Sequence, residues 1–177
     1  LSAQVSTQSL VAEAALLHEV GGWDETLTCW QDYELGFRLL RHAPRPAWCE
    51  QVFHRIYRTA DSITGHSLSA NASGIAAALC RLAEQVETPS AFPRATGDAQ
   101  QLSAQCRRAL WLRAHIVAGW FCAEGAAPSA ESLLRVVGSR LRPLPFADRV
   151  VCGLLRRYTA LGGRAAWRLA LLWCALR

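Results

Sequence analysis

The chain has 177 residues, 51% of them apolar and 19% charged, with a formal net charge of +5 at pH 7. A chain of this length and composition predicts a soluble globular protein with a sizeable core. Its best candidate for a membrane span, Ala165 to Leu176, is too short and is interrupted by Arg168. No segment of this sequence therefore has the length and composition of a membrane-spanning helix.

Cysteine usage and the start of the chain indicate its context. The seven cysteines are an odd number with no Cys-x-x-Cys spacing, which fits neither a disulfide framework nor a zinc site. Reduced, mostly buried thiols predict a cytoplasmic protein, and no signal-peptide pattern opens the chain. The chain begins at Leu1 and contains no Met, which we interpret as a fragment or a processed product.

Charge divides the sequence into two halves of opposite sign. Residues 1–93 hold six Arg and ten acidic residues, whereas residues 94–177 hold thirteen Arg and four acidic residues. Thr88 to Thr96 is a proline-containing stretch with the composition of a linker. We therefore predict a first unit over 1–88, a linker over 89–98 and a basic, helical second unit over 99–177.

Hydrophobic periodicity predicts strands and helices in the first unit. Gly21-Gly22 ends the first helix, and the second helix is amphipathic, with Tyr33, Phe37 and Leu40 on one face. The predicted strands are Gln4 to Val11 and Ala47 to Tyr57, and the predicted helices are 12–20, 31–42 and 67–86. The second unit is predicted to form helices over 99–123, 129–141, 146–161 and 164–176. The expected fold class is thus α/β, mainly helical by content.

The segment most indicative of chemistry reads VGGWDETL and, shortly after, WQDYELGFRL. Paired glycines, here Gly21 and Gly22, let a backbone approach a ligand closely. Asp32 falls in the first turn of a predicted helix, where the helix dipole favours the carboxylate, and a carboxylate can take a proton from an attacking hydroxyl. Trp23 and Trp30 flank this segment, and flat aromatic rings can stack on sugar faces.

Each of these features also has a purely structural interpretation. Asp32 can serve only to stabilise its helix, and Gly21-Gly22 can be a plain helix stop. Trp23 and Trp30 can belong to the core. The joint order and spacing of these residues, rather than any one of them, favours a substrate site.

In that order and spacing, the segment resembles family 2 glycosyltransferases, whose second half carries a vGGfDE-x-L motif, an acidic motif and helix residues ending in Arg-Leu. The similarity is tight from Val5 to Leu39 and extends loosely through Tyr57-Arg58 and Asp61 to Thr64. It implies the acceptor-side, C-terminal part of a Rossmann-like GT-A domain, without the nucleotide-binding half and followed by a helical extension. It also implies inverting transfer of a sugar from a nucleotide-sugar donor to a hydroxyl of a glycan or lipid-linked acceptor, as in cell-envelope polysaccharide synthesis.

The resemblance assigns a role to each matching residue. Asp32 corresponds to the catalytic base, and Gly21 and Gly22 correspond to the glycine loop near the donor sugar. Gln31 occupies a position that the family often fills with Glu, and Arg38 is expected to pair with an acid. The remaining substrate-binding candidates are Trp23, Asp24, Glu25 and Trp30, with a role in loop structure open for Asp24 and Glu25.

A divalent cation, Mg²⁺ or Mn²⁺, is the cofactor that the resemblance implies for the full-length enzyme, with most of its ligands outside this chain. The family's metal-binding Asp-x-Asp does not occur in these residues. The position at which the family often has a metal-binding His is Ala60 here. His54 is therefore the candidate ligand and His66 a second choice, with a structural role for His54 as the alternative.

The basic second unit suggests a surface contact. Arg107, Arg108 and Arg113 alternate with Trp111 and Trp120, and the last helices also mix Arg with Trp. Such helices suit peripheral contact with the cytoplasmic face of a membrane, whereas a bundle with a solvated Arg-rich face is the simpler interpretation. The alternative function is a non-catalytic helical module on a degenerate transferase remnant, binding a membrane surface or a partner. No motif that reads nucleic acid is present.

Overall fold

The computed structural model describes residues 10–42, 47, 51, 67–88 and 99–176, and all structural statements below concern these residues. Every regular element among them is a helix. The α-helices are α1 (Ala14–Glu19), α2 (Gln31–Arg41), α3 (Ala72–Glu87), α4 (Ala99–Ala123), α5 (Ala127–Gly138), α6 (Phe146–Ala160) and α7 (Ala166–Ala175), and a 3-10 turn, η2 (Leu68–Asn71), precedes α3. These helices confirm the predicted helical segments to within a few residues at most ends.

The prediction of an α/β, GT-A-like fold is wrong, because the described residues contain no strand and no sheet. In an α/β domain, helices bury their apolar faces against a sheet. Here Ile75, Leu79 and Val86 of α3 are buried in one core with Leu110 and Val117 of α4. The apolar face of α3 is thus covered by other helices. The predicted strands, apart from residues 10, 11, 47 and 51, lie outside the described residues.

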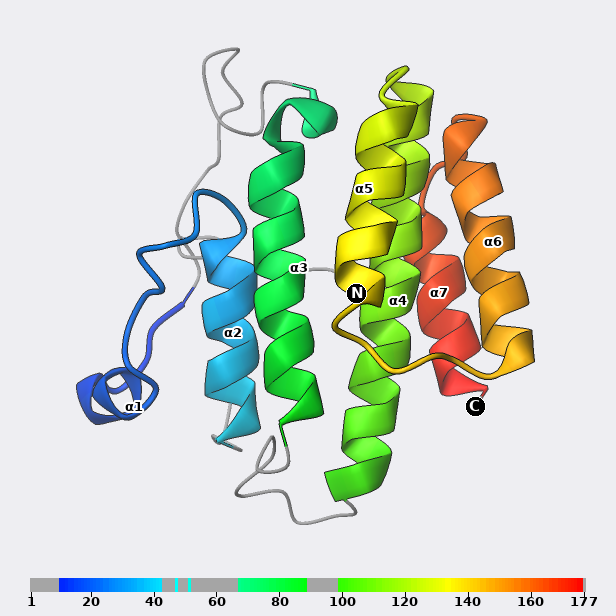
Figure 1. Cartoon of the computed structure of the whole chain (residues 1–177). Helices are drawn as coiled ribbons and strands as arrows, with labels where there is room; N and C mark the ends of the chain where they lie inside the picture. Colours follow the sequence, from blue (N-terminus) through cyan, green and yellow to red (C-terminus); the bar gives the residue numbers. More distant parts are fainter. Residues whose placement is uncertain (1–9, 43–46, 48–50, 52–66, 89–98, 177) are drawn as a thin grey trace.

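Helix α4 is the centre of the bundle and contacts α3 and α5 as well as α6 and α7 (Figure 1). Ala114 and Phe121 belong to the core shared with α3 and α5, whereas Leu112 and Ile116 belong to a second core shared with α6 and α7. Both cores draw on α4, so this helix is apolar around much of its circumference. The first core includes helices from both sides of residues 89–98, and the division into units stays a prediction.

A buried carboxylate connects α4, α6 and α7. Asp148 is only 1% exposed, and it accepts hydrogen bonds from Arg108 Nε at 3.1 Å and from Trp173 Nε1 at 2.7 Å. A buried charge is tolerated when it is paired and hydrogen-bonded in this way. Within the part of the chain that the structure describes, no helix is both long enough and apolar enough to cross a bilayer.

Candidate functional site

The predicted glycine loop forms the C-terminal end of α1. Gly21 and Gly22 both adopt positive φ angles, of 80° and 64°, and their N–H groups donate to His18 O at 3.0 Å and to Leu17 O at 2.9 Å. These amides are therefore engaged by the helix end, as in a helix stop. The glycines also border an open hollow of about 450 Å³, which Ala14, Leu17 and His18 complete.

Asp24 fastens the following loop to α3. Its Oδ1 accepts hydrogen bonds from the Thr26 N–H at 3.1 Å and the Thr26 hydroxyl at 2.5 Å, and its Oδ2 accepts one from Arg81 Nε at 2.9 Å. The Thr26 hydroxyl, together with the Arg81 guanidinium, holds the pKa of Asp24 below its ordinary value. The geometry gives Asp24 the role in loop structure that the sequence left open, while the neighbouring Glu25 is exposed.

Trp30 packs between α2 and α4. Its ring meets Tyr33 edge-to-face at 5.8 Å, and the Arg113 guanidinium lies 4.7 Å from its centroid. The same guanidinium lies 5.6 Å from the centroid of Trp120, and burial lowers the pKa of Arg113. Trp30 is thus engaged in packing, and Trp23, at 44% exposed, is the tryptophan of this segment that solvent reaches readily.

A buried ion pair fixes α2 against its neighbours. Glu34 is 1% exposed, and its carboxylate accepts hydrogen bonds from Arg38 Nε at 2.7 Å, from Arg38 Nη2 at 2.6 Å and from Gln85 Nε2 at 2.5 Å. Arg38 Nη1 also donates to the carbonyl of Val20 at the end of α1. The expected pairing of Arg38 with an acid is confirmed, and this pair joins α1, α2 and α3.

Asp32 stands apart from these ion pairs. It lies half-buried in the first turn of α2, and its Oδ1 accepts a hydrogen bond from the Tyr33 N–H at 2.9 Å. In the described segments Asp32 has no ion-pair partner, whereas Asp24 pairs with Arg81 and Glu34 pairs with Arg38. Asp32 is therefore the partly buried acid of the motif that retains an oxygen for another molecule.

The predicted site residues fall into two groups in space. Trp30, Gln31 and Asp32 adjoin at the start of α2, where Gln31 Nε2 donates to Leu27 O at 2.7 Å. Gly21 instead lies beside Arg38, because a Cβ on this glycine would be 4.0 Å from Arg38 Nη1. Arg38 follows Asp32 by six residues, or nearly two helical turns, along α2. At roughly 1.5 Å per residue this is about 9 Å along the helix axis. The substrate-binding roles of these residues stay predictions.

The predicted metal ligand cannot be placed, since His54 lies outside the described residues. Among the residues that are described, no group of three or more His, Cys, Asp or Glu side chains has an arrangement that could hold a metal ion. The divalent cation that the resemblance implies, with most of its ligands outside this chain, stays a prediction.

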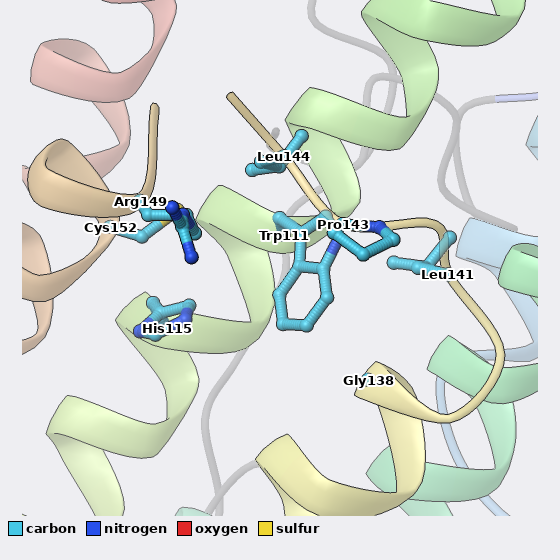
Figure 2. Close-up of a pocket in the computed structure, with 8 residues that line it drawn as sticks. All are labelled: Trp111, His115, Gly138, Leu141, Pro143, Leu144, Arg149 and Cys152. Atoms are coloured by element: carbon cyan, nitrogen blue, oxygen red, sulfur yellow. The ribbon is translucent and has the colours of Figure 1, made fainter. Parts of the chain in front are cut away.

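A second pocket, of about 330 Å³, was not predicted from the sequence and lies between α4, the end of α5, the α5–α6 loop and α6 (Figure 2). Its walls are mostly apolar, and its polar members are His115, Arg149 and the Cys152 thiol. It is lined by Trp111, His115, Gly138, Leu141, Pro143, Leu144, Arg149 and Cys152. A histidine within an otherwise apolar stretch of the 99–123 helix was the signal available in the sequence.

Burial favours the neutral forms of His115 and Cys152 in this second pocket. Burial, with a contribution from Arg156, lowers the pKa of His115 to about 4, and its Nδ1 is buried without a hydrogen-bond partner among the described residues. Burial also raises the pKa of the Cys152 thiol to about 12. A protonated thiol is a poor nucleophile, so Cys152 is not an activated cysteine.

Comparisons of the chain with protein-family models, with curated proteins and with solved structures gave no match. The similarity of the Val20-to-Leu39 segment to family 2 glycosyltransferases therefore stays a prediction from the sequence.

Proposed function

We propose that this chain supplies the general base of a sugar-transfer reaction, in which Asp32 deprotonates the acceptor hydroxyl. The hydroxyl oxygen would attack the anomeric carbon of a nucleotide sugar while the bond from that carbon to the diphosphate oxygen breaks. The proton would pass to the Asp32 carboxylate and the electron pair would leave with the nucleoside diphosphate. One in-line displacement of this kind inverts the anomeric configuration.

The observation that carries the proposal is that ion pairs engage Asp24 and Glu34 of the motif but not Asp32. Asp24 and Glu34 are saturated by ion pairs and hydrogen bonds, so neither is free to accept a proton from a substrate. One carboxylate oxygen of Asp32 accepts a hydrogen bond from the Tyr33 N–H, and this bond fixes the orientation of the Asp32 side chain. It lies half-buried in the first turn of α2, with its second oxygen unengaged by the described residues.

The surrounding contacts hold Asp32 in place without engaging its carboxylate. Two residues further along α2, Glu34 is bound by Arg38 and by Gln85 of α3, which fixes the helix that presents Asp32. Trp23, Glu25 and the glycine pair remain the proposed substrate contacts.

The proposal is tested in the full-length encoded protein with a panel of nucleotide sugars, by measuring release of the nucleoside diphosphate in the presence of acceptor. Asp32→Asn is expected to lower turnover by about 10² to 10⁴-fold, the usual contribution of a general base. Donor affinity, measured by calorimetry, is expected to stay unchanged because Asp32 acts on the acceptor. Near-normal turnover of Asp32→Asn would show that another group is the base.

A further inference from the structure

An exposed apolar stripe runs along the outer side of α6. Its members recur every three or four residues, so they lie on one side of the helix, and their exposed fractions range from 42% to 89%. The opposite side of α6 is buried against α4. The stripe consists of Phe146, Val150, Leu154, Tyr158 and Leu161.

Helix α7 extends the exposed apolar surface. It contacts both α4 and α6 (Figure 1), and its buried residues Ala166 and Ala170 face this contact. Leu169, Leu172 and Leu176 are turned away from the core and are 48%, 59% and 70% exposed. Soluble monomers rarely expose so many large apolar residues on adjoining elements, and such surfaces usually bind something.

The charges on these two helices have a single sign at the surface. Residues 146–176 contain five Arg and one acid, and that acid, Asp148, is buried and paired with Arg108. Arg149 lies over the ring of Phe146 at 5.8 Å, and Arg168 lies over the ring of Trp167 at 5.2 Å. The positive charge of these helices is thus carried in part by guanidinium groups that lie over aromatic rings.

From this pattern we infer that the outer faces of α6 and α7 bind the surface of an anionic lipid bilayer. The apolar stripe would enter the boundary between headgroups and acyl chains, and the arginines would contact lipid phosphates. The exposed side chains of α6 and α7 include no acid, so the charge of this surface is positive throughout and complements the phosphates of an anionic bilayer. This charge complementarity, next to exposed apolar side chains, favours lipid as the occupant.

The contact differs from the one that the Trp content of the sequence suggests. Trp111 Nε1 donates to the carbonyl of Arg142, and Trp173 Nε1 donates to Asp148. Both indole N–H groups are therefore engaged within the protein. The leucines, Phe146 and Tyr158 form the outward surface instead. This inference is independent of the sugar-transfer proposal, since none of its residues lies near Asp32 in the sequence.

The test is flotation of the full-length protein with vesicles of phosphatidylcholine alone and with vesicles containing about 30% phosphatidylglycerol, at low and high salt. Binding is expected only to the anionic vesicles and is expected to weaken with salt. Leu154→Asp and, separately, Leu172→Asp should each lower the partition coefficient by about tenfold or more. Leu40→Asp, at a 53% exposed leucine of α2, is the matched control and should leave binding unchanged.

Circular dichroism establishes that each variant is folded before its binding is compared. The inference is overturned if the protein binds neither vesicle, if it binds neutral and anionic vesicles equally, or if Leu154→Asp and Leu40→Asp behave alike. Self-association that Leu154→Asp abolishes, without vesicle binding, would overturn it in favour of a second copy of the chain as the occupant.

Discussion

Gly119 on α4 lies so close to Thr159 on α6 that a Cβ on residue 119 would sit 1.7 Å from the Thr159 hydroxyl oxygen. Thr159 is fully buried, and its hydroxyl is bound to the carbonyls of Leu155 and Arg156 on its own helix. The hydroxyl therefore needs no hydrogen-bond partner on α4, and the absence of a side chain at Gly119 lets the two helices approach each other closely. This contact fixes α6 with its apolar stripe facing outwards.

Adding one methyl group at this crossing should destabilise the fold. Gly119→Ala is expected to lower the free energy of unfolding by about 3 kcal/mol, since the surrounding backbone has to move apart. Urea denaturation measures this change. Gly153→Ala is the matched control, because a Cβ there meets nothing within 4 Å, and it should be neutral or stabilising by up to about 1 kcal/mol. Equal effects of the two substitutions would show that the helices are not in close contact.

The two kinds of ion pair in this protein should respond differently to removal of one charge. Glu34→Gln leaves Arg38 without its buried partner and is expected to cost about 3 kcal/mol of unfolding free energy. Glu84→Gln removes the partner of Arg140, but both of these side chains are 42–51% exposed, so the expected cost is below about 1 kcal/mol. Chemical denaturation of both variants checks the prediction, and a larger cost for Glu84→Gln would contradict it.

His115 should make stability depend on pH. Its pKa is about 4 in the folded chain against 6.5 ordinarily, so below pH 6.5 the unfolded chain binds a proton that the folded chain does not. Stability is therefore complete above pH 6.5 and is lost as the pH falls towards 4. From pH 7 to pH 5 the loss should be about 2 kcal/mol.

His115→Gln tests this dependence, because the variant cannot titrate at this position. Urea denaturation of both proteins at pH 7 and pH 5 gives the four unfolding free energies that are needed. The difference between the two pH values should be smaller in the variant by about 2 kcal/mol. If the wild type and the variant lose the same stability between these pH values, the imidazole is not buried as a neutral group.

The helices could be predicted from the sequence because their signals are local. Gly21-Gly22 ends α1, and prolines separate the later helices. The spacing of Glu34 and Arg38, one helical turn apart, already favours an ion pair. The prediction that Leu40 lies on the apolar face of α2 was wrong, because Leu40 is 53% exposed whereas Leu35 and Leu39 are buried.

The packing could not be predicted in the same way, because it depends on partners far apart in the chain. An apolar face such as that of α3 fits a sheet or another helix equally well, and here it meets α4 and α5. A role of Asp24 in loop structure could be predicted from the sequence, but its pairing with Arg81 spans 57 residues and could not. The second pocket likewise joins residues of α4 and α6 that only the fold brings together.

The most direct test of the role of Asp32 is the ratio of two turnover numbers, for Asp32→Asn and for Asp24→Asn in the full-length protein. Both substitutions replace a carboxylate by an amide in the same segment, but Asp24 is engaged by Thr26 and Arg81. With turnover expressed per folded molecule, we predict that Asp32→Asn is slower than Asp24→Asn by about 10²-fold or more. A ratio near one, or a slower Asp24→Asn, would contradict the assignment of Asp32 as the base.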